Sequence, residues 1–339
     1  MKFERFTAEY LPPGGSAQQN IPHVLVVPSA GTIIQLHNDR FPSFELLGYT
    51  PFGLELDWEQ NAAYRYYVTF DKIRVLSAGG VTAWKVGGRF ALGGGLFVNS
   101  GKTTLENKVP SIVYAGAPGL PDASSSLTGS DTSPNYHLGI LWQANRTLRI
   151  GAAYRSAIDL NERGDARLTI PNGPTITDQW SAPLKLPQNV SLGFAWQATP
   201  DTLIAGQADW VDWSVLKQEV ITFRQGALPN ITMARNWKDR TQLRLGVEYA
   251  VRKSLALPAG YSYDPSPVPD TTLDPQLFDL NRQIVSVGFG TSSRDWTLDV
   301  AYEHFFGQSR TTTTSIHAFP TNGTYRGSAD ILTLTVSYR

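Results

Sequence analysis

Seven ionisable side chains lie on predicted β-strands in a fixed relation to their neighbours. Along each strand polar and apolar residues alternate, and each of the seven occupies a polar position. Arg244 and Glu248, for example, alternate with Leu243, Leu245 and Val247. Side chains of a strand point alternately to opposite faces, so the seven share the polar faces of their strands. Charges placed in this way could line a water-filled lumen and bind or repel the charged group of a solute. The seven are Arg149, Arg155, Asp209, Arg244, Glu248, Asp299 and Glu303.

Catalytic chemistry is not indicated by the other reactive residue types. The five histidines are scattered without the spacing of metal ligands, and no Gly-x-Ser-x-Gly segment occurs. The absence of cysteine excludes thiolate metal sites, disulfides and cysteine nucleophiles. His304 precedes two phenylalanines near a predicted strand end, a position typical of an interfacial aromatic girdle rather than of a general base. We therefore expect no enzymatic activity, no metal and no cofactor.

The elements that carry these charges predict a transmembrane β-barrel. Predicted strands often run to roughly ten residues or more and end in aromatic residues such as Trp196 and Tyr249, whereas strands of soluble sandwiches average about five or six. A cation facing lipid at mid-membrane costs about 2–4 kcal/mol, so charges must segregate to the lumen. The lipid face is predicted to include Leu192, Leu245, Val287 and Leu334. The alternative is a soluble barrel or sandwich with a polar exterior.

Composition agrees with this reading. The 339 residues contain as many Lys and Arg as Asp and Glu, which argues against nucleic-acid binding. No apolar run approaches the ~20 residues of a transmembrane helix, so a membrane location requires a closed barrel. We expect residues 1–339 to form one all-β domain, an antiparallel barrel of about fourteen strands.

The predicted strands alternate between short turns and long connections. Short turns are predicted near 87–88, 144–146, 199–201, 251–253 and 292–294, and long loops at 107–133, 167–187, 225–235, 264–280 and 311–326. This asymmetry is typical of outer-membrane barrels, whose periplasmic turns are short. The predicted strands are 2–11, 22–35, 41–56, 64–86, 89–106, 134–144, 147–166, 188–198, 202–224, 236–250, 253–263, 281–292, 295–310 and 327–338.

Several segments resemble one known family in order along the chain. They are residues 186–194 (LPQNVSLGF), 209–214 (DWVDWS), 236–239 (NWKD) followed by 245–249 (LGVEY), and 259–270 (AGYSYDPSPVPD). Together they resemble FadL/TodX-type outer-membrane transporters of long-chain fatty acids and hydrocarbons. The resemblance is clearest over roughly the C-terminal two-thirds. It implies an N-terminal plug carrying Asn-Pro-Ala. Lys2-Phe3-Glu4-Arg5 leads into no apolar signal-peptide core, and residues 1–339 contain no Asn-Pro-Ala, so we expect both signal peptide and plug to be absent from them.

Pro51 and Gly53 predict a bend in the third strand, because proline removes a ladder hydrogen bond. The simpler interpretation is a proline at a strand end. The resemblance implies instead an inward kink that opens a side window through the barrel wall, by which an apolar molecule could leave into the bilayer.

Two predicted loops, 107–133 and 167–187, are unusually apolar for exposed segments. Apolar side chains presented together commonly mark a binding surface, although these could also pack on one another as a lid. The resemblance implies a groove that captures the ligand at the extracellular side. The predicted groove residues are Val109, Ile112, Val113, Tyr114, Leu120, Leu168, Ile170, Ile176 and Trp180.

The sequence and the resemblance together predict uptake of hydrophobic molecules across the outer membrane of a Gram-negative bacterium. Passive diffusion would carry the ligand, with lateral release at the kinked strand. A general porin and a structural or adhesive barrel are the alternatives. Expected partners are the hydrophobic ligand, outer-membrane lipid and lipopolysaccharide, and the barrel-assembly machinery, with a monomer as the expected state. Whether the ligand is a fatty acid, a monoaromatic or an alkane stays open.

Overall fold

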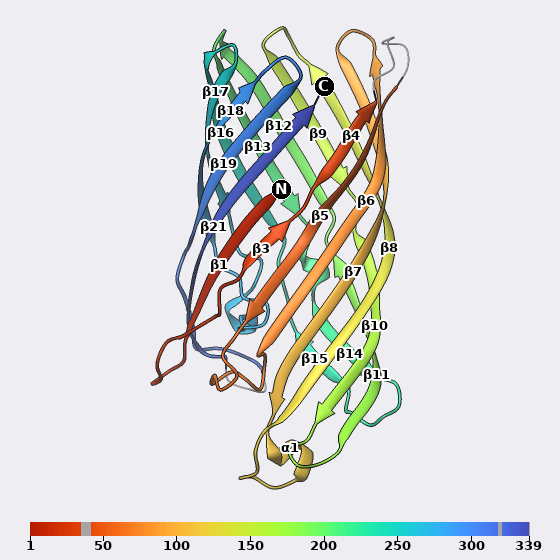
Figure 1. Cartoon of the computed structure of the whole chain (residues 1–339), viewed down its shortest axis with the longest axis vertical. Coiled ribbons are helices and arrows are strands. Elements are labelled where there is room, and N and C mark those ends of the chain that lie inside the picture. The colour runs from red at the N-terminus through yellow and green to blue at the C-terminus, as the bar shows by residue number, and fades with distance from the viewer. Residues whose placement is uncertain (35–41, 318–320, 339) are drawn as a thin grey trace.

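The computed structural model describes residues 1–34, 42–317 and 321–338 and has the form of a tall barrel (Figure 1). Its strands are β1 (Lys2–Leu11), β2 (Gln18–Gln19), β3 (Val24–Val27), β4 (Ala30–Ile34), β5 (Ser43–Asp57), β6 (Phe70–Val86), β7 (Phe90–Val109), β8 (Ala123–Gln143), β9 (Leu148–Arg155), β10 (Ile158–Thr169), β11 (Thr175–Leu186), β12 (Asn189–Thr199), β13 (Thr202–Val211), β14 (Gln218–Phe223), β15 (Ile231–Ala234), β16 (Arg240–Arg252), β17 (Leu255–Asp264), β18 (Arg282–Ser292), β19 (Trp296–Gly307), β20 (Arg310–Thr312) and β21 (Gly323–Tyr338). Its short helices are α1 (Ser111–Ala115), η1 (Trp213–Val215) and η2 (Asp270–Thr272). Among the described residues, no helix is long and apolar enough to cross a membrane.

The main strands form a closed antiparallel ring, as the sequence predicts. From β1 the ladder passes to β21 and then through β19, β18, β17, β16, β13, β12, β9, β8, β7, β6 and β5 to β4. The other edge of β1 pairs with β3, which leads directly into β4. Counted with β3 and β4 as one interrupted strand, the described part of the chain gives a ring of fourteen.

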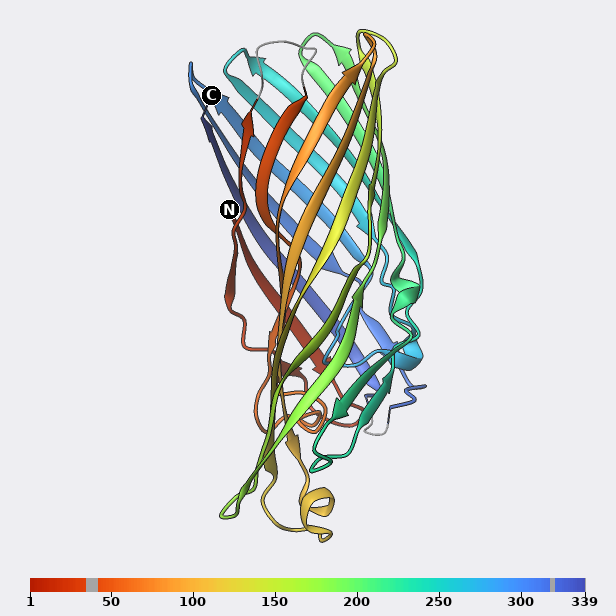
Figure 2. The same cartoon turned by 90° about the vertical axis from the view of Figure 1, so that its right-hand side faces the viewer.

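The two ends of the barrel differ in their connections (Figures 1 and 2). At one end, here called the turn end, a few residues join β6 to β7, β8 to β9, β12 to β13, β16 to β17 and β18 to β19, at the five predicted places. Gly87 has a φ of 61° in the first of these turns, a conformation that glycine adopts without steric cost. The opposite end, here called the loop end, carries the long connections and α1.

The predicted loop at 167–187 is wrong. Residues 175–186 form β11, which pairs along its whole length with β10. Only the Pro-Asn-Gly-Pro segment at 171–174 turns, with Asn172 in the left-handed region at a φ of 55°. The prolines at 171, 174 and 183 suggested a loop, but Pro183 is accommodated within the strand, opposite Asn161. Strand pairing with β10 therefore overrides the local signal.

Other predicted boundaries also need correction. β8 begins at Ala123, eleven residues before the predicted start, so the loop predicted at 107–133 shrinks to α1 and its flanks. The predicted strand at 202–224 divides into β13, η1 and β14, and β15 occupies part of the loop predicted at 225–235. The predicted strand at 64–86 begins only at Phe70. The predicted boundaries at residues 35 and 41 lie outside the described residues.

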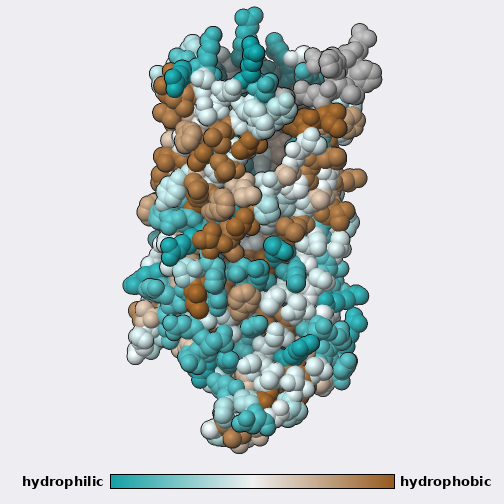
Figure 3. Space-filling view, viewed as in Figure 1, coloured by the Kyte–Doolittle hydropathy of each residue, from teal (hydrophilic) through white to brown (hydrophobic). Residues whose placement is uncertain are grey.

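The outer wall has an apolar band next to the turn end and a polar surface toward the loop end (Figure 3). On β7, the outward side chains are apolar from Phe90 to Val98 and polar from Ser100 onward. On β8 the outward side chains are apolar as far as Tyr136 and Pro134 and polar at Thr132 and Ser130. The four residues predicted to face lipid, Leu192, Leu245, Val287 and Leu334, are all exposed large hydrophobic residues. The band is where a bilayer would surround the barrel.

The interior at the loop end is a packed apolar core rather than an open channel. Side chains of β1, β5, β7, β8, β10, β11 and β14 pack there against residues of the 58–68 and 268–280 segments, which fold inward. Trp58 is fully buried, and its indole N–H donates to the Pro275 carbonyl over 3.1 Å. The Tyr64 ring packs on Trp58 at 4.9 Å, and Tyr10 in turn contacts the rings of Tyr64 and Tyr325 at 5.2 and 4.9 Å. These inward segments close the barrel at the loop end.

Candidate functional site: a lumen, a side opening and a capped loop end

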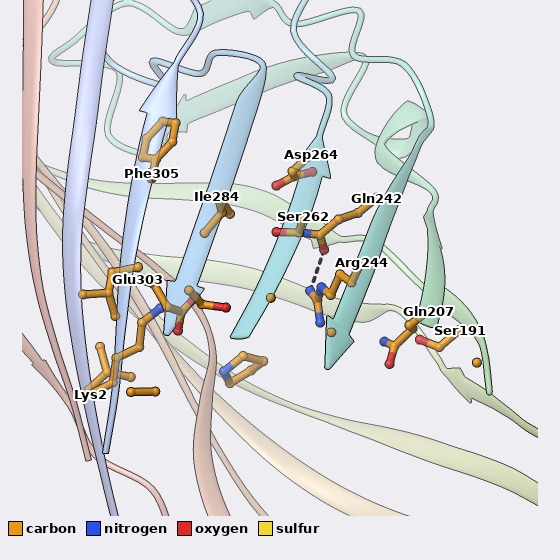
Figure 4. Close-up of a pocket in the computed structure, with 18 of the residues that line it drawn as sticks. Lys2, Ser191, Gln207, Gln242, Arg244, Ser262, Asp264, Ile284, Glu303 and Phe305 are labelled. Carbon is orange, nitrogen blue, oxygen red and sulfur yellow. Dashed lines mark hydrogen bonds between the residues drawn. The ribbon is translucent and has the colours of Figure 1, made fainter. Parts of the chain in front are cut away.

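A cavity of about 1820 Å³ occupies the barrel interior between the apolar core and the turn end. Charged residues from strands all around the ring reach it, and Figure 4 shows Glu303, Lys2 and Arg244 on different strands around the same space. The charged lining residues are Lys2, Glu4, Glu55, Lys72, Arg74, Arg149, Arg244, Glu248, Asp264, Asp279, Arg282 and Glu303. Both signs are represented, so the lumen is polar without a strong preference for one charge.

Four of the seven predicted lumen residues line this cavity: Arg149, Arg244, Glu248 and Glu303. Asp209 lies behind Arg244, whose Nε is 3.7 Å from the Asp209 carboxylate. The amide of Gln207 donates to both oxygens of Asp209, over 2.7 and 2.9 Å, and the Ser191 hydroxyl also donates to it. Asp209 is therefore buried and held in place. A charge-assisted network of this kind can fix the position of the Arg244 side chain beside the lumen.

The remaining two predicted lumen residues lie away from the cavity lining. The exposed Asp299 is on β19 near the turn end, paired with Gly290 across the ladder. Arg155 is mostly buried beside the kinked strand, and its guanidinium lies 4.9 Å from the ring centre of Phe52. The Nε of Arg155 has no hydrogen-bond partner among the described residues.

The barrel wall is unpaired between β3 and β5. Within the described residues, β3 pairs with β1 and β4 pairs with β5, but no ladder joins β3 to the Tyr49–Asp57 part of β5. At the loop-end side of this unpaired stretch, the Ile21 amide donates to the Asp57 carbonyl over 2.7 Å, and His23 lies 3.0 Å from the Asp57 carboxylate. Residues 23–28 on one edge and 50, 51 and 53–55 on the other line the central cavity. Both edges of this unpaired stretch of wall therefore border the central cavity.

The edge formed by β5 carries an extra residue. The register with β6 runs regularly to Tyr49 opposite Ser77 and resumes at Phe52 opposite Val75, so three steps on β5 match two on β6. This is a β-bulge, which bends a strand and ends regular pairing. Pro51 lies within it and Gly53 directly follows it. The bend predicted from Pro51 and Gly53 thus coincides with a real irregularity of the strand.

The inward 268–280 segment is held at the loop end by a buried ionic cluster. Arg235 is 1% exposed and pairs with Asp274, which is fully buried, and with Glu219 at 2.5 Å. Its guanidinium also donates to the Gln276 amide oxygen over 3.0 Å. The cluster ties the segment after β15 to the 265–280 segment. A buried pair of this kind becomes strongly destabilising when one partner is lost.

The predicted capture residues fall into two groups. Ile112, Val113 and Leu120 are exposed on and beside α1, which reaches beyond the rest of the loop end (Figure 2). Leu168 and Trp180 are instead buried inside the wall, where the Trp180 indole N–H lies within hydrogen-bonding distance of the Thr128 and Asp165 carbonyls. Placing these two in an exposed loop is therefore wrong. The other predicted members, Val109, Tyr114, Ile170 and Ile176, are half-buried.

Sequence reasoning missed the Arg235 cluster and the buried acids Asp71 and Glu162. Asp71 is 1% exposed, and neither of its carboxylate oxygens has a hydrogen-bond partner among the described residues. These residues come from β6, β10, β14, the segment after β15 and the inward 268–280 segment, far apart in the chain. No spacing or motif links them, so only the folded chain brings them together.

Comparison with known proteins agrees with this architecture. The sequence profile of a family described as outer membrane protein transport protein (OMPP1/FadL/TodX) matches residues 4–339. The long-chain fatty acid transport protein of Escherichia coli O6:H1 is 22% identical over 288 residues, which cover 76% of this chain and 64% of that protein. The chain spans between 53% and 64% of the length of the curated relatives that it matches.

Two solved structures share the fold. The crystal structure of a Pseudomonas aeruginosa FadL homologue superposes with a TM-score of 0.86 at 19% identity, covering 99% of this chain and 88% of that one. The Pseudomonas putida toluene transporter TodX superposes with a TM-score of 0.75 at 16% identity, covering 99% and 89%. At these identities the likeness shows a shared barrel fold.

Proposed function

The chain belongs to the OMPP1/FadL/TodX family of outer membrane transport proteins, and on that premise we propose that it takes up hydrophobic molecules by passive diffusion and releases them sideways into the bilayer. The loop end is then extracellular and the turn end periplasmic. A family of transport proteins also agrees with the expected lack of enzymatic activity. Named relatives transport long-chain fatty acids and toluene, so the proposed ligand class is a fatty acid or a hydrocarbon.

The observation that carries the proposal is the unpaired wall between β3 and β5. An apolar molecule is poorly soluble in the periplasm, and transfer from water to an apolar environment is favourable by roughly 25 cal/mol per Å². A side path at the height of the apolar band lets such a molecule enter the membrane without crossing water. The Pro51 bulge supports this path, because it bends β5 away from the partner that would otherwise close the wall.

Capture is proposed at the tip of the loop end. Exposed Ile112, Val113 and Leu120 give an apolar surface, and the half-buried Val109, Tyr114, Ile170 and Ile176 of the two neighbouring hairpins can extend it. Leu168 and Trp180 would support this surface from inside the wall. From there the ligand must pass the apolar core, so a local rearrangement of the inward segments is part of the proposal.

Deletion of Pro51 tests lateral release. Removing this one residue restores equal spacing between Tyr49 and Phe52 on β5 and their partners on β6, so β5 can pair regularly and approach β3. Uptake of a labelled fatty acid or toluene by cells should fall at least about tenfold, as closure of the exit path predicts. Pro51→Ala is the matched control, since it keeps the extra residue and should retain most uptake. A folded barrel changes its gel migration when it is heated, and this change would show that both variants fold.

Ligand uptake by the Pro51 deletion variant at the wild-type rate would overturn lateral release. Liposome swelling with small sugars separates the proposal from a general porin, because a porin passes them readily. Absence of any ligand uptake by the wild-type protein would favour a structural barrel. The proposal also includes a monomeric state and assembly by the barrel-assembly machinery. The uptake experiment bears on neither of these.

A further inference from the structure

Three cations form one row across the outer wall, at the edge of the apolar band that faces the loop end. Arg74 on β6 is paired with Lys102 on β7. Ser130 on β8 lies between Lys102 and Arg163 on β10 and is paired with both. The three cations, here called the basic row, are exposed, whereas the residues directly beside them along the chain are buried or half-buried. Their side chains therefore point outward. Arg74 is also next to the unpaired part of β5 and so borders the central cavity as well.

The basic row lies a short distance beyond the last apolar side chains of the band (Figure 3). On β6 the exposed Leu76 is two residues from Arg74, and on β7 the exposed Val98 is four residues from Lys102. At roughly 3.3 Å per residue and a tilt of ~40°, these spacings correspond to about 5 and 10 Å of height. The layer of polar lipid headgroups begins at the edge of the hydrocarbon core. The basic row is therefore at the height of lipid headgroups.

The positive charge of the basic row is not neutralised by the protein. Within residues 1–34, 42–317 and 321–338, no carboxylate lies within ion-pairing distance of any of the three cations. Asp165 is two residues from Arg163 on the same face of β10, and the Gln179 amide donates to its carboxylate. The positions paired with the ends of the row are Gly53 and Ser181, which carry no charge.

Exposed cations of β1 and β21 show the contrast. Arg5 on β1 is paired across the ladder with Asp330, and the Arg326 guanidinium on β21 lies 3.0 Å from the Glu9 carboxylate. Each of these cations therefore has an acidic partner within the wall. The basic row instead leaves three positive charges side by side, which repel one another unless an anion binds between them.

We propose that the basic row binds the phosphorylated disaccharide headgroup of one lipopolysaccharide molecule in the outer leaflet. Neighbouring strands are about 4.8 Å apart, so the backbones of Arg74 and Arg163 are roughly 14 Å apart along the row. A disaccharide with a phosphate on each sugar can place one phosphate between Arg74 and Lys102 and the other at Arg163. Arginine binds phosphate oxygens through two parallel hydrogen bonds. The Ser130 hydroxyl faces the sugars, and the acyl chains lie over Val98 on the apolar band.

This partner is separate from the transported ligand, because the basic row is on the outer wall. The inference rests on the outer-membrane location and on the proposed orientation with the loop end extracellular, since lipopolysaccharide occupies the outer leaflet. It does not depend on lateral release. The Pro51 deletion leaves the basic row intact, so the failure of lateral release and the failure of lipid binding are distinguishable.

Native mass spectrometry of the full chain in detergent tests the site, by titration with diphosphoryl lipid A, monophosphoryl lipid A or dioleoyl phosphatidylglycerol. The wild-type protein should retain one diphosphoryl lipid A about tenfold more readily than either of the other two lipids, because only diphosphoryl lipid A offers a phosphate to both ends of the row. Lys102→Gln combined with Arg163→Gln should remove this preference. Lys102→Arg should keep it, because the positive charge stays in place.

Arg326→Gln is the matched control, since Arg326 is another exposed cation of the outer wall but is paired with Glu9. It should leave lipid retention unchanged. An unchanged preference in the Lys102 and Arg163 double variant would overturn the proposal, as would an equal loss in Arg326→Gln. Retention of phosphatidylglycerol by the wild-type protein as readily as diphosphoryl lipid A would also overturn it, because the row would then attract any anionic lipid. All substituted residues are exposed, and the change in gel migration on heating would verify that each variant folds.

Discussion

The Arg155 guanidinium lies over the ring of Phe52, 4.9 Å from its centre, at the point where β5 resumes regular pairing after its bulge. Phe52 also contacts Trp213 edge-on, at a ring distance of 6.2 Å. One cation is thus placed against an aromatic residue next to the side opening. A cation over an aromatic face is stabilised by about 0.5–2 kcal/mol, which is less than a buried pair with a carboxylate provides. A ligand carboxylate could therefore compete for Arg155.

Substitution of Arg155 by Met should separate acidic from neutral ligands. We expect Arg155→Met to weaken binding of a long-chain fatty acid about tenfold and to leave an alkane of equal length unchanged, because the lost charge-assisted hydrogen bond contributes about 1.5–3 kcal/mol. Fluorescence displacement by each ligand in detergent measures both affinities. Arg149→Met is the control, since Arg149 lines the cavity without contacting Phe52. Equal losses for the acid and the alkane would contradict a carboxylate site at Arg155.

Loss of Arg235 should loosen the closed loop end. Arg235→Met leaves Asp274 and Glu219 without their shared cation, and breaking such a buried pair costs about 3–5 kcal/mol. We expect a lower unfolding midpoint in urea and more frequent open-channel events in planar-bilayer recordings. Arg224→Met, at an exposed position just after β14, should change neither quantity. Identical recordings from the two variants would show that the cluster does not hold the inward segments.

The buried acid Glu162 should make stability depend on pH. Glu162 is on β10, which lies beyond the apolar band, and it is 2% exposed with no hydrogen-bond partner for Oε1 among the described residues. Burial raises the pKa of Glu162 from its ordinary value near 4.5 to about 7. The folded state therefore keeps a proton that the unfolded chain releases, so this contribution is complete below about pH 4.5 and is lost as the pH rises through 7.

Glu162→Gln should remove that loss. At pH 8 the variant should be more stable than the wild-type protein by about 3 kcal/mol, and the difference should shrink toward pH 5. Urea unfolding midpoints in micelles across pH 5–8 measure this. Asp165→Asn, an exposed position on the same strand, is the control and should leave the pH dependence as in the wild type. A Glu162→Gln curve parallel to the wild-type curve would mean that another group dominates.

The architecture could be predicted from the sequence because it depends on local regularities. The alternation around Arg244 and Glu248 fixes which face meets lipid, and a one-residue slip would place charges in the bilayer. Short turns such as that at Gly87 mark where strands reverse. Pro51 signals its bend locally, since a missing N–H disrupts the ladder wherever the strand lies.

The tertiary structure alone decided what fills and interrupts the barrel. β11 forms despite three prolines in and before it, because β10 offers a complete partner edge. Arg235, Asp274 and Glu219 meet only after the loop-end segments fold inward, and their pairing depends on burial rather than on spacing in the chain. The unpaired wall between β3 and β5 is a place where strands fail to pair. Failure to pair depends on how neighbouring strands approach one another in space, and no property of a single strand reports it.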